Sequence, residues 1–241
     1  MCRGKPRGAR IFTNIEREDE SYDVEEIVLP SGQQVPPRAG RFRVTPPPHL
    51  RDFNKELFYV EYDYPELIVR DAALRVLFNL EREEAQYQIY QWEQTVGDKG
   101  GIAVEHCGYA LNWSSSPGAN GYLQQFVPEF SFVDASTWSS LSKEEEDMAY
   151  LPCVPAVVLH FTTDVDTMEI LQTKTHRFVC AGTREGVVVD ISGERVWIHN
   201  RGEKPHFEAL GVIEFDSWPG FTLDCGAILA YRERERRRLG L

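Results

Sequence analysis

The stretch 127–190 constrains the fold of this chain more than any other, because apolar runs and isolated polar residues alternate along it in a regular order. Alternating apolar residues at 128–133 and the apolar run at 155–161 are both typical of β-strands. Apolar residues then recur with helical spacing over 167–181, and a second apolar run follows at 186–191. The pattern predicts strand, loop, strand, helix and strand, in that order.

Three polar side chains interrupt this pattern where the predicted elements would face one cleft. Glu129 lies on the first strand, His160 on the second, and Lys174 on the helix that follows. A carboxylate, a second metal-binding group and a lysine around one cleft are the parts of a metal-dependent phosphodiesterase. Plainer interpretations also fit: an exposed carboxylate, a core or edge histidine with satisfied hydrogen bonds, and a solvated lysine on an amphipathic helix. The residues alone leave both interpretations open.

The rest of the chain predicts further strands and one more long helix. The expected strands cover residues 57–62, 66–70, 102–105, 109–113, 122–126 and 195–199. The first two would form a hairpin that carries Glu61 and Glu66 on its strands. A helix is expected from the N-cap Asp71 through the polar region that ends near Gln94. Strands mixed with two main helices predict an α/β or α+β fold around a mixed sheet.

Composition divides the chain into an arm, one domain and a tail. Its 241 residues, 42% of them hydrophobic, suffice to bury one substantial core. Prolines and a charged run make residues 1–50 a predicted flexible arm. Residues 51–230 are the predicted folded domain, and 231–241 are a predicted arginine-rich tail.

The charge of the chain is unevenly distributed, which bears on its partners. The net charge is −12, yet residues 1–10 carry +4 and residues 231–241 carry +3, which leaves −19 for residues 11–230. Because nucleic-acid binding depends largely on Lys and Arg at phosphates, an acidic body weakens the case for a DNA partner. A nucleic-acid partner would therefore require a local basic cleft or the two basic ends.

The cysteines and the apolar runs indicate the compartment. The five cysteines are widely spaced and include no C-x-x-C pair, which argues against a disulfide framework and a structural zinc site. No apolar run approaches the roughly 18–20 residues that a membrane span requires. The basic N-terminus has no apolar segment behind it, as a secretory signal would. We therefore expect an intracellular protein, cytoplasmic or nuclear, that is neither secreted nor bound to a membrane.

Six short segments follow one another in a characteristic order: the hairpin 58–69, then 128–133, 155–161, 174–182, 187–190 and 219–224. In this joint order the chain resembles, from about residue 55 to 230, the Uma2 family, restriction endonucleases of the PD-(D/E)XK superfamily. The last five segments correspond in turn to the family's "PDvaFv", "PdlvvEVls", "K…Y…aGv", "vWlvD" and "lPGfsLdl". The resemblance implies a restriction-endonuclease-like fold, a mixed β-sheet flanked by helices.

The resemblance also implies a divalent-metal site, Mg²⁺ or Mn²⁺, whose ligands are altered here. The family's aspartate and glutamate ligands correspond to Glu129 and His160, whereas the lysine that assists the attacking water is retained as Lys174. An imidazole in place of a carboxylate removes one negative charge and favours Mn, Fe, Zn or Cu over Mg. Glu61 or Glu66 could add a ligand, as the opening segment does in some members of the superfamily.

Two hypotheses of different classes follow. In the first, the chain is a metal-dependent nuclease, with DNA as the expected substrate, and it could act as a homodimer that cuts two strands. In the second, the chain keeps the nuclease fold without catalysis and serves as a protein-binding or scaffolding module. The histidine at position 160 and the acidic body motivate the second hypothesis.

Overall fold

A computed structural model describes most of the chain, in two compact units that interleave along the sequence. The described residues are 27–28, 34–35, 40–43, 58–63, 66–71, 80–96, 100–105, 107–113, 122–148, 150–163 and 166–240. Unit 1 comprises residues 1–77, 108–126 and 143–152, and unit 2 comprises residues 78–107, 127–142 and 153–241. Among the described residues, no helix has both the length and the apolar character needed to cross a bilayer.

Unit 1 is built on a six-stranded sheet with the order β10-β7-β8-β4-β5-β3. Its strands are β3 (Gly40–Arg43), β4 (Phe58–Asp63), β5 (Glu66–Asp71), β7 (Gly108–Trp113), β8 (Tyr122–Phe126) and β10 (Tyr150–Leu151). The short elements β1 (Ile27–Val28), β2 (Gln34–Val35) and α4 (Lys143–Glu146) complete its described part. The antiparallel pairing of β4 with β5 confirms the predicted hairpin and places Glu61 opposite Ile68.

Two expectations for the first 80 residues differ from the structure. Strand β3 lies inside the predicted flexible arm and pairs antiparallel with β5. The arm's prolines flank this strand instead of interrupting it, so its backbone donors remain available for the sheet. Asp71, the predicted N-cap, is the last residue of β5, and the described helix α2 (Leu80–Val96) begins later. Strands β1 and β2 also lie within the predicted arm; its other residues and residues 72–79 lie outside the described residues.

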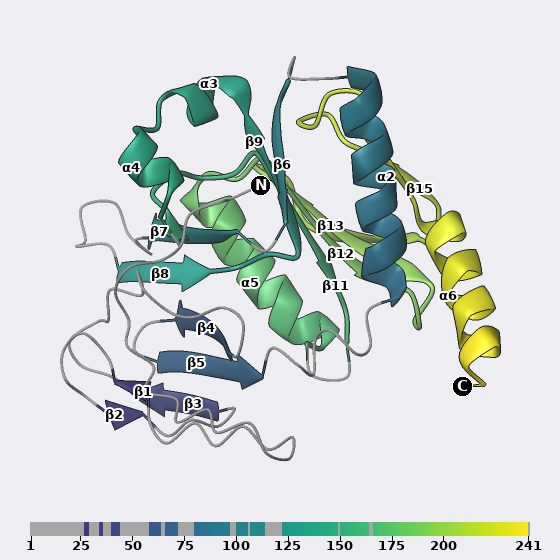
Figure 1. The fold of residues 1–241 in the computed structure, drawn as a ribbon, viewed down its shortest axis with the longest axis horizontal. Helices are drawn as coiled ribbons and strands as arrows, with labels where there is room; N and C mark the ends of the chain where they lie inside the picture. The colour runs from purple at the N-terminus through teal and green to yellow at the C-terminus, as the bar shows by residue number, and fades with distance from the viewer. Residues whose placement is uncertain are drawn as a thin grey trace, which may run out of the picture. The chain divides into compact units, whose positions relative to one another are not determined.

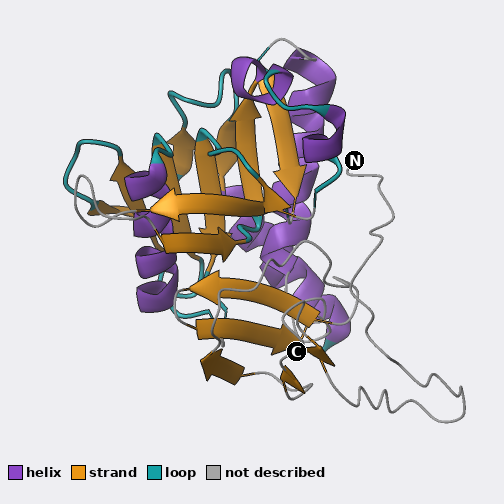
Figure 2. Ribbon diagram, turned by 90° about the vertical axis from the view of Figure 1, so that its left-hand side faces the viewer, coloured by secondary structure: helices purple, strands orange, loops and turns teal. Residues whose placement is uncertain are grey.

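Unit 2 is built on a second six-stranded sheet with the order β14-β13-β12-β11-β9-β6. Figure 2 shows strands lying side by side with helices next to them. Its strands are β6 (Gly101–Glu105), β9 (Phe130–Asp134), β11 (Val157–Phe161), β12 (Glu185–Asp190), β13 (Arg195–Asn200) and β14 (His206–Ala209). Strands β11 and β12 are parallel and joined by helix α5 (Met168–Ala181), whereas the other pairs are antiparallel. The predicted strand, loop, strand, helix and strand are all present, and the predicted mixed α+β architecture is confirmed.

Helices cover both faces of the unit 2 sheet (Figure 1). Helix α5 packs on β11, β12 and β13, and α2 packs on α6 (Cys225–Leu239) on the other side. Because side chains alternate along a strand, Val157, Leu159 and Phe161 join the core with α2 and α6. The intervening side chains, including His160, belong to the face that α5 covers. Both faces are buried, which explains the nearly continuous apolar runs of the sequence.

The core beneath α2 is closed by aromatic residues from distant parts of the chain. Trp92 of α2 lies edge-on to Phe132 at 5.9 Å and to Trp218 at 5.7 Å between ring centroids. Trp218 and Phe221 lie in the segment between β15 (Val212–Glu214) and β16 (Thr222–Asp224), with ring centroids 4.3 Å apart. Such aromatic pairs contribute about 0.5–1.5 kcal/mol each beyond the area that they bury.

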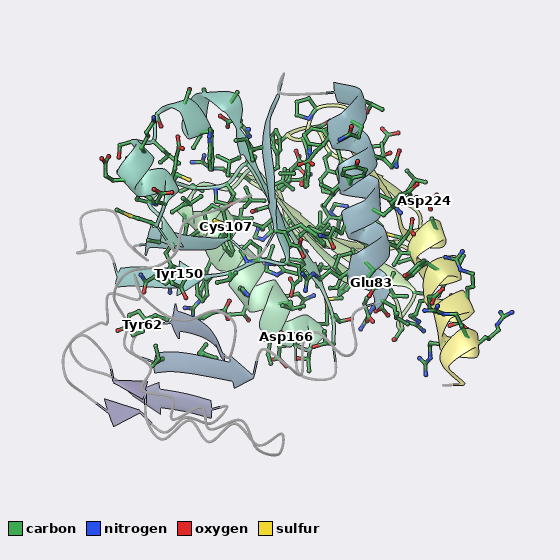
Figure 3. All side chains as sticks on the ribbon, viewed as in Figure 1. Tyr62, Glu83, Cys107, Tyr150, Asp166 and Asp224 are labelled. Carbon is green, nitrogen blue, oxygen red and sulfur yellow. The ribbon has the colours of Figure 1, made fainter. Side chains whose placement is uncertain are left out.

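The residues predicted as an arginine-rich tail belong to helix α6. Two polar contacts join this helix to α2: the Tyr231 hydroxyl donates to Glu83 at 2.6 Å, and Arg232 donates to Glu81 at 3.3 Å. Figure 3 labels Glu83 on α2 and Asp224 at the start of α6. The Asp224 carboxylate accepts from the Ala227 N–H and so caps the helix.

Candidate active site

The pairing of β9 with β11 brings the first two predicted site residues together. The antiparallel register sets Val158 opposite Ser131 and Leu159 opposite Phe130. One further step places His160 opposite Glu129, the residue immediately before β9. Because residues two apart share one face of a sheet, both side chains lie on the face that α5 covers. The two residues, 31 positions apart in sequence, are therefore brought together by the backbone register alone.

The side chains of Glu129 and His160 contact each other directly. The Glu129 Oε2 lies 2.7 Å from the His160 Nδ1, within hydrogen-bonding distance. Glu129 is 1% exposed and His160 is 0% exposed. A buried carboxylate is costly unless it is paired and hydrogen-bonded, and the imidazole is a partner that meets this requirement. The interpretation of Glu129 as an exposed surface carboxylate is therefore wrong.

Lys174 is directed from α5 into the same region of unit 2. Its Nζ donates to the backbone carbonyl oxygen of Val127 at 2.7 Å, and the residue is only 7% exposed. Val127 stands two residues before Glu129, so the lysine is bonded to the segment that carries the carboxylate. The alternative of a solvated lysine on the outer face of α5 is wrong.

A close approach of α5 to β12 allows Lys174 to reach this segment. Gly186 of β12 faces α5, and a Cβ at this position would overlap the Cγ2 of Thr175, the residue next to Lys174. A glycine is therefore required for the observed spacing between helix and strand. The helix ends as the sequence predicts, because Gly182 adopts φ 128° and its N–H bonds to the carbonyl oxygens of Phe178 and Val179.

The two additional candidates, Glu61 and Glu66, lie in the hairpin of unit 1. Glu61 is buried in β4 at 1% exposure. Glu66 is the first residue of β5, and in the backbone register it lies opposite Asp63 of β4 and Arg43 of β3. Because the candidate site is described within unit 2, the expectation that either carboxylate completes it stays a prediction.

A second polar cluster, between α5 and β13, was not predicted from the sequence. The ring of His176, on α5, stacks on the ring of His199, on β13, with centroids 5.2 Å apart and planes inclined by 6°. The Cys180 thiol lies 3.4 Å from the His176 Nε2, and Trp197 packs edge-on against His199. Burial and, secondarily, the neighbouring His176 lower the pKa of His199 below its usual 6.5. The i, i+4 spacing of His176 and Cys180 was the available sequence signal.

The donor set of Glu129 and His160 decides which metal ion would suit the site. Across the part of the chain that the structure describes, no three His, Cys, Asp or Glu residues are grouped as metal ligands. Mg²⁺ favours an octahedron of oxygen ligands, whereas this pair provides one carboxylate and one imidazole. The pair therefore does not fit Mg²⁺; its chemistry fits an ion that accepts mixed nitrogen and oxygen ligands, such as Zn²⁺ or Mn²⁺.

Comparisons with known proteins support the fold. No protein-family model matches the sequence, and no curated protein matches it. Among solved structures, the chain is similar to the crystal structure of a "putative nuclease belonging to DUF820" from Anabaena variabilis ATCC 29413. The TM-score is 0.55 at 11% sequence identity, over 71% of this chain and 90% of the other. At this identity the similarity concerns the fold alone: the chain has a restriction-endonuclease-like α+β fold.

Proposed function

We propose that this chain is a nucleic-acid phosphodiesterase, with DNA as the preferred substrate, and that Glu129, His160 and Lys174 form its reaction centre. The observation that carries the proposal is that Glu129 and His160 meet on the sheet face that α5 covers, while Lys174 of α5 bonds to Val127, two residues before Glu129. The finer assignment, to a divergent Uma2-type member of the PD-(D/E)XK superfamily, rests on the order of the sequence segments.

Each side chain has a role in this proposal. A carboxylate oxygen of Glu129 and a ring nitrogen of His160 would hold the metal ion, which supplies a water of lowered pKa and a Lewis acid for the phosphate. Lys174 brings an ammonium charge into a region with little water, where it would stabilise negative charge developing on phosphate oxygens. Its hydrogen bond to Val127 defines the position from which the ammonium acts.

Substrate binding must overcome the acidic character of the chain. Guanidinium groups near the end of α6 are of the kind that contacts phosphates: Arg234 is 68% exposed and Arg238 is 73% exposed, and a phosphate would compete with Glu235, which both contact. Such contacts would be weakened by salt. A homodimer, which many nucleases use to cut both strands, is part of the same proposal.

A second, non-catalytic function is favoured because the polar groups of the candidate site already bond to other protein groups. Glu129 and His160 bond to each other, Lys174 bonds to a main-chain carbonyl, and all three are at least nine-tenths buried. A reactive centre must contact its substrate, so catalysis would require this region to open. In the alternative, the three residues stabilise the fold of a non-catalytic, protein-binding module.

A cleavage assay with matched variants separates the two functions. Single- and double-stranded DNA and RNA would be incubated with the full chain and Mg²⁺, Mn²⁺ or Zn²⁺. Lys174→Met and His160→Gln remove the proposed groups, whereas Lys204→Met and His206→Gln make the same changes at exposed positions of unit 2. We expect cleavage with Mn²⁺ or Zn²⁺, at least about 100-fold slower in the first two variants only.

Other results would reject the phosphodiesterase. No cleavage of any substrate with any of the three ions by the folded wild type would favour the non-catalytic module. Cleavage that survives unchanged in both Lys174→Met and His160→Gln would show that the activity arises elsewhere, and the assignment of the site would be wrong.

A further inference from the structure

We infer that Glu129 is a positioning residue, which holds the His160 ring in the tautomer with the proton on Nδ1 and so makes Nε2 the electron-pair donor. The role in catalysis rests on the proposed function, whereas the tautomer does not. Besides the carboxylate oxygen that it would offer a metal ion, Glu129 therefore also acts on the neighbouring imidazole through their hydrogen bond.

The first support is geometric. The contact joins the Glu129 Oε2 specifically to the His160 Nδ1, at 2.7 Å. The backbone register fixes both residues on one sheet face, so the contact does not depend on a long flexible side chain reaching across a surface. The exposed pair of His206 and Glu208, on β14, uses the other ring nitrogen, Nε2, at 3.1 Å. The carboxylate therefore meets Nδ1 in the buried pair and Nε2 in the exposed pair.

The second support is the chemistry of the two groups. An ionised carboxylate only accepts hydrogen bonds, so the nitrogen that faces it must carry the hydrogen. A neutral imidazole has one N–H, and placing it on Nδ1 leaves the lone pair on Nε2. Around His160, which is fully buried, water does not compete for this hydrogen bond as it does around an exposed histidine.

The consequence is that the Nε2 of His160 is prepared to act as a metal ligand. A carboxylate that accepts from one ring nitrogen orients the ring and makes the other nitrogen a better ligand, as in carboxylate–histidine–zinc arrangements. Glu129 can thus support metal binding through His160. A second consequence is selectivity, because a nitrogen donor prepared in this way favours Zn²⁺ over Mg²⁺.

The test reads the tautomer directly, without metal or substrate. Long-range proton–nitrogen NMR spectra of the ¹⁵N-histidine-labelled full chain near neutral pH distinguish a protonated from an unprotonated ring nitrogen. His160→Gln assigns the signals. We expect the Nδ1–H form for His160 in the wild type and a mixture in Glu129→Gln, because an amide can both donate and accept. Glu208→Gln is the matched control and should leave the His160 signals unchanged.

A metal titration provides the second readout. Calorimetric titration with Zn²⁺ should show about 10- to 100-fold weaker binding in Glu129→Gln than in the wild type and in Glu208→Gln. If Glu129→Gln does not fold, Glu129→Asp serves in its place, since a side chain shorter by one methylene withdraws the carboxylate from the contact.

The outcomes separate this inference from the proposed function. An Nε2–H tautomer in the wild type, or an Nδ1–H tautomer that persists fully in Glu129→Gln, would overturn the inference even if the protein cuts DNA. The expected tautomer and Zn²⁺ affinities, together with no cleavage of any nucleic acid, would support the positioning role and overturn the nuclease.

Discussion

The Nζ of Lys174 lies 2.7 Å from the carbonyl oxygen of Val127, so a buried lysine side chain joins helix α5 to the segment that leads into β9. The bond spans 47 residues of sequence. It joins α5 to the segment that carries Glu129, two residues after Val127. One contact therefore links the stability of unit 2 to the proposed chemistry.

Replacing Lys174 should separate these two effects. Lys174→Met leaves the buried carbonyl of Val127 without this donor, and we expect a loss of about 1–3 kcal/mol in unfolding free energy. Lys174→Arg retains a cation and donors but not the compact ammonium, so it should recover part of the stability and little of the cleavage activity. Chemical denaturation and the cleavage assay measure the two quantities. A Lys174→Met protein as stable as Lys204→Met would contradict the expectation.

The spacing of α5 and β12 depends on Gly186. Gly186→Ala would place a methyl group against the Cγ2 of Thr175, and we expect destabilisation of about 1–3 kcal/mol from overpacking. Thr175→Ser removes that Cγ2, so the double variant should be more stable than the two single effects predict. Gly211→Ala, where a Cβ meets only the Ala209 carbonyl oxygen at 3.9 Å, is the control. Simple additivity in urea unfolding would show that the close approach does not set the spacing.

The carboxylate of Asp134 should contribute an acid-dependent part of the stability. Burial raises its pKa, but hydrogen bonds from Ser136 and Thr137 and the charge of Arg184 outweigh burial and lower it from 3.8 to about 2. A group with a lowered pKa stabilises the folded state above its unfolded pKa, and this contribution is lost as the pH falls from about 4 towards 2.

Two substitutions separate the charge of Asp134 from its role as the N-cap of α3 (Ala135–Ser139). Asp134→Asn keeps a good cap without the charge, so its stability should fall less steeply below pH 4 than that of the wild type. Asp134→Ala also loses the cap, at an additional cost of about 0.5–2 kcal/mol. Urea unfolding between pH 2 and 6 measures both; parallel curves for wild type and Asp134→Asn would contradict the assigned role of the charge.

His199 should give the protein a second pH dependence, in a milder range. Its pKa is lowered by burial and by His176, so the unfolded chain binds a proton at a higher pH than the folded chain does. Stability should therefore decline as the pH falls below about 6.5. His199→Phe keeps an aromatic ring next to Trp197 and should flatten this part of the curve, whereas His206→Gln should not. Thermal melting between pH 5 and 8 provides the measurement.

The sequence predicted the elements around the site well because their patterns are strong. The buried strands β11 and β12 appear as apolar runs, and Gly182 ends α5 as expected. The polar interruptions Glu129 and His160 predicted a candidate site, because a buried sheet face rarely carries such groups without a partner, and the two side chains do contact each other.

Other features could not be read from the sequence because they depend on distances between elements. The nitrogen of His160 that meets Glu129 depends on how the ring is turned, and the bond of Lys174 to a main-chain oxygen depends on the packing of α5 on the sheet. The need for glycine at position 186 could not be predicted, because it depends on the contact that a Cβ there would make with Thr175 of α5. Strand β3 was missed because it is short and lies between prolines, which led us to predict that the whole segment is irregular.

The pairing of α2 with α6 has a consequence for how the protein is made. Gln88 of α2 bonds to the backbone of Asp224, 136 residues later, and the core beneath α2 includes Ile228 of α6. On the ribosome, α2 emerges long before its partner is synthesised. Until then, Trp92 and its apolar neighbours lack part of their cover, so the nascent chain exposes surfaces that molecular chaperones recognise.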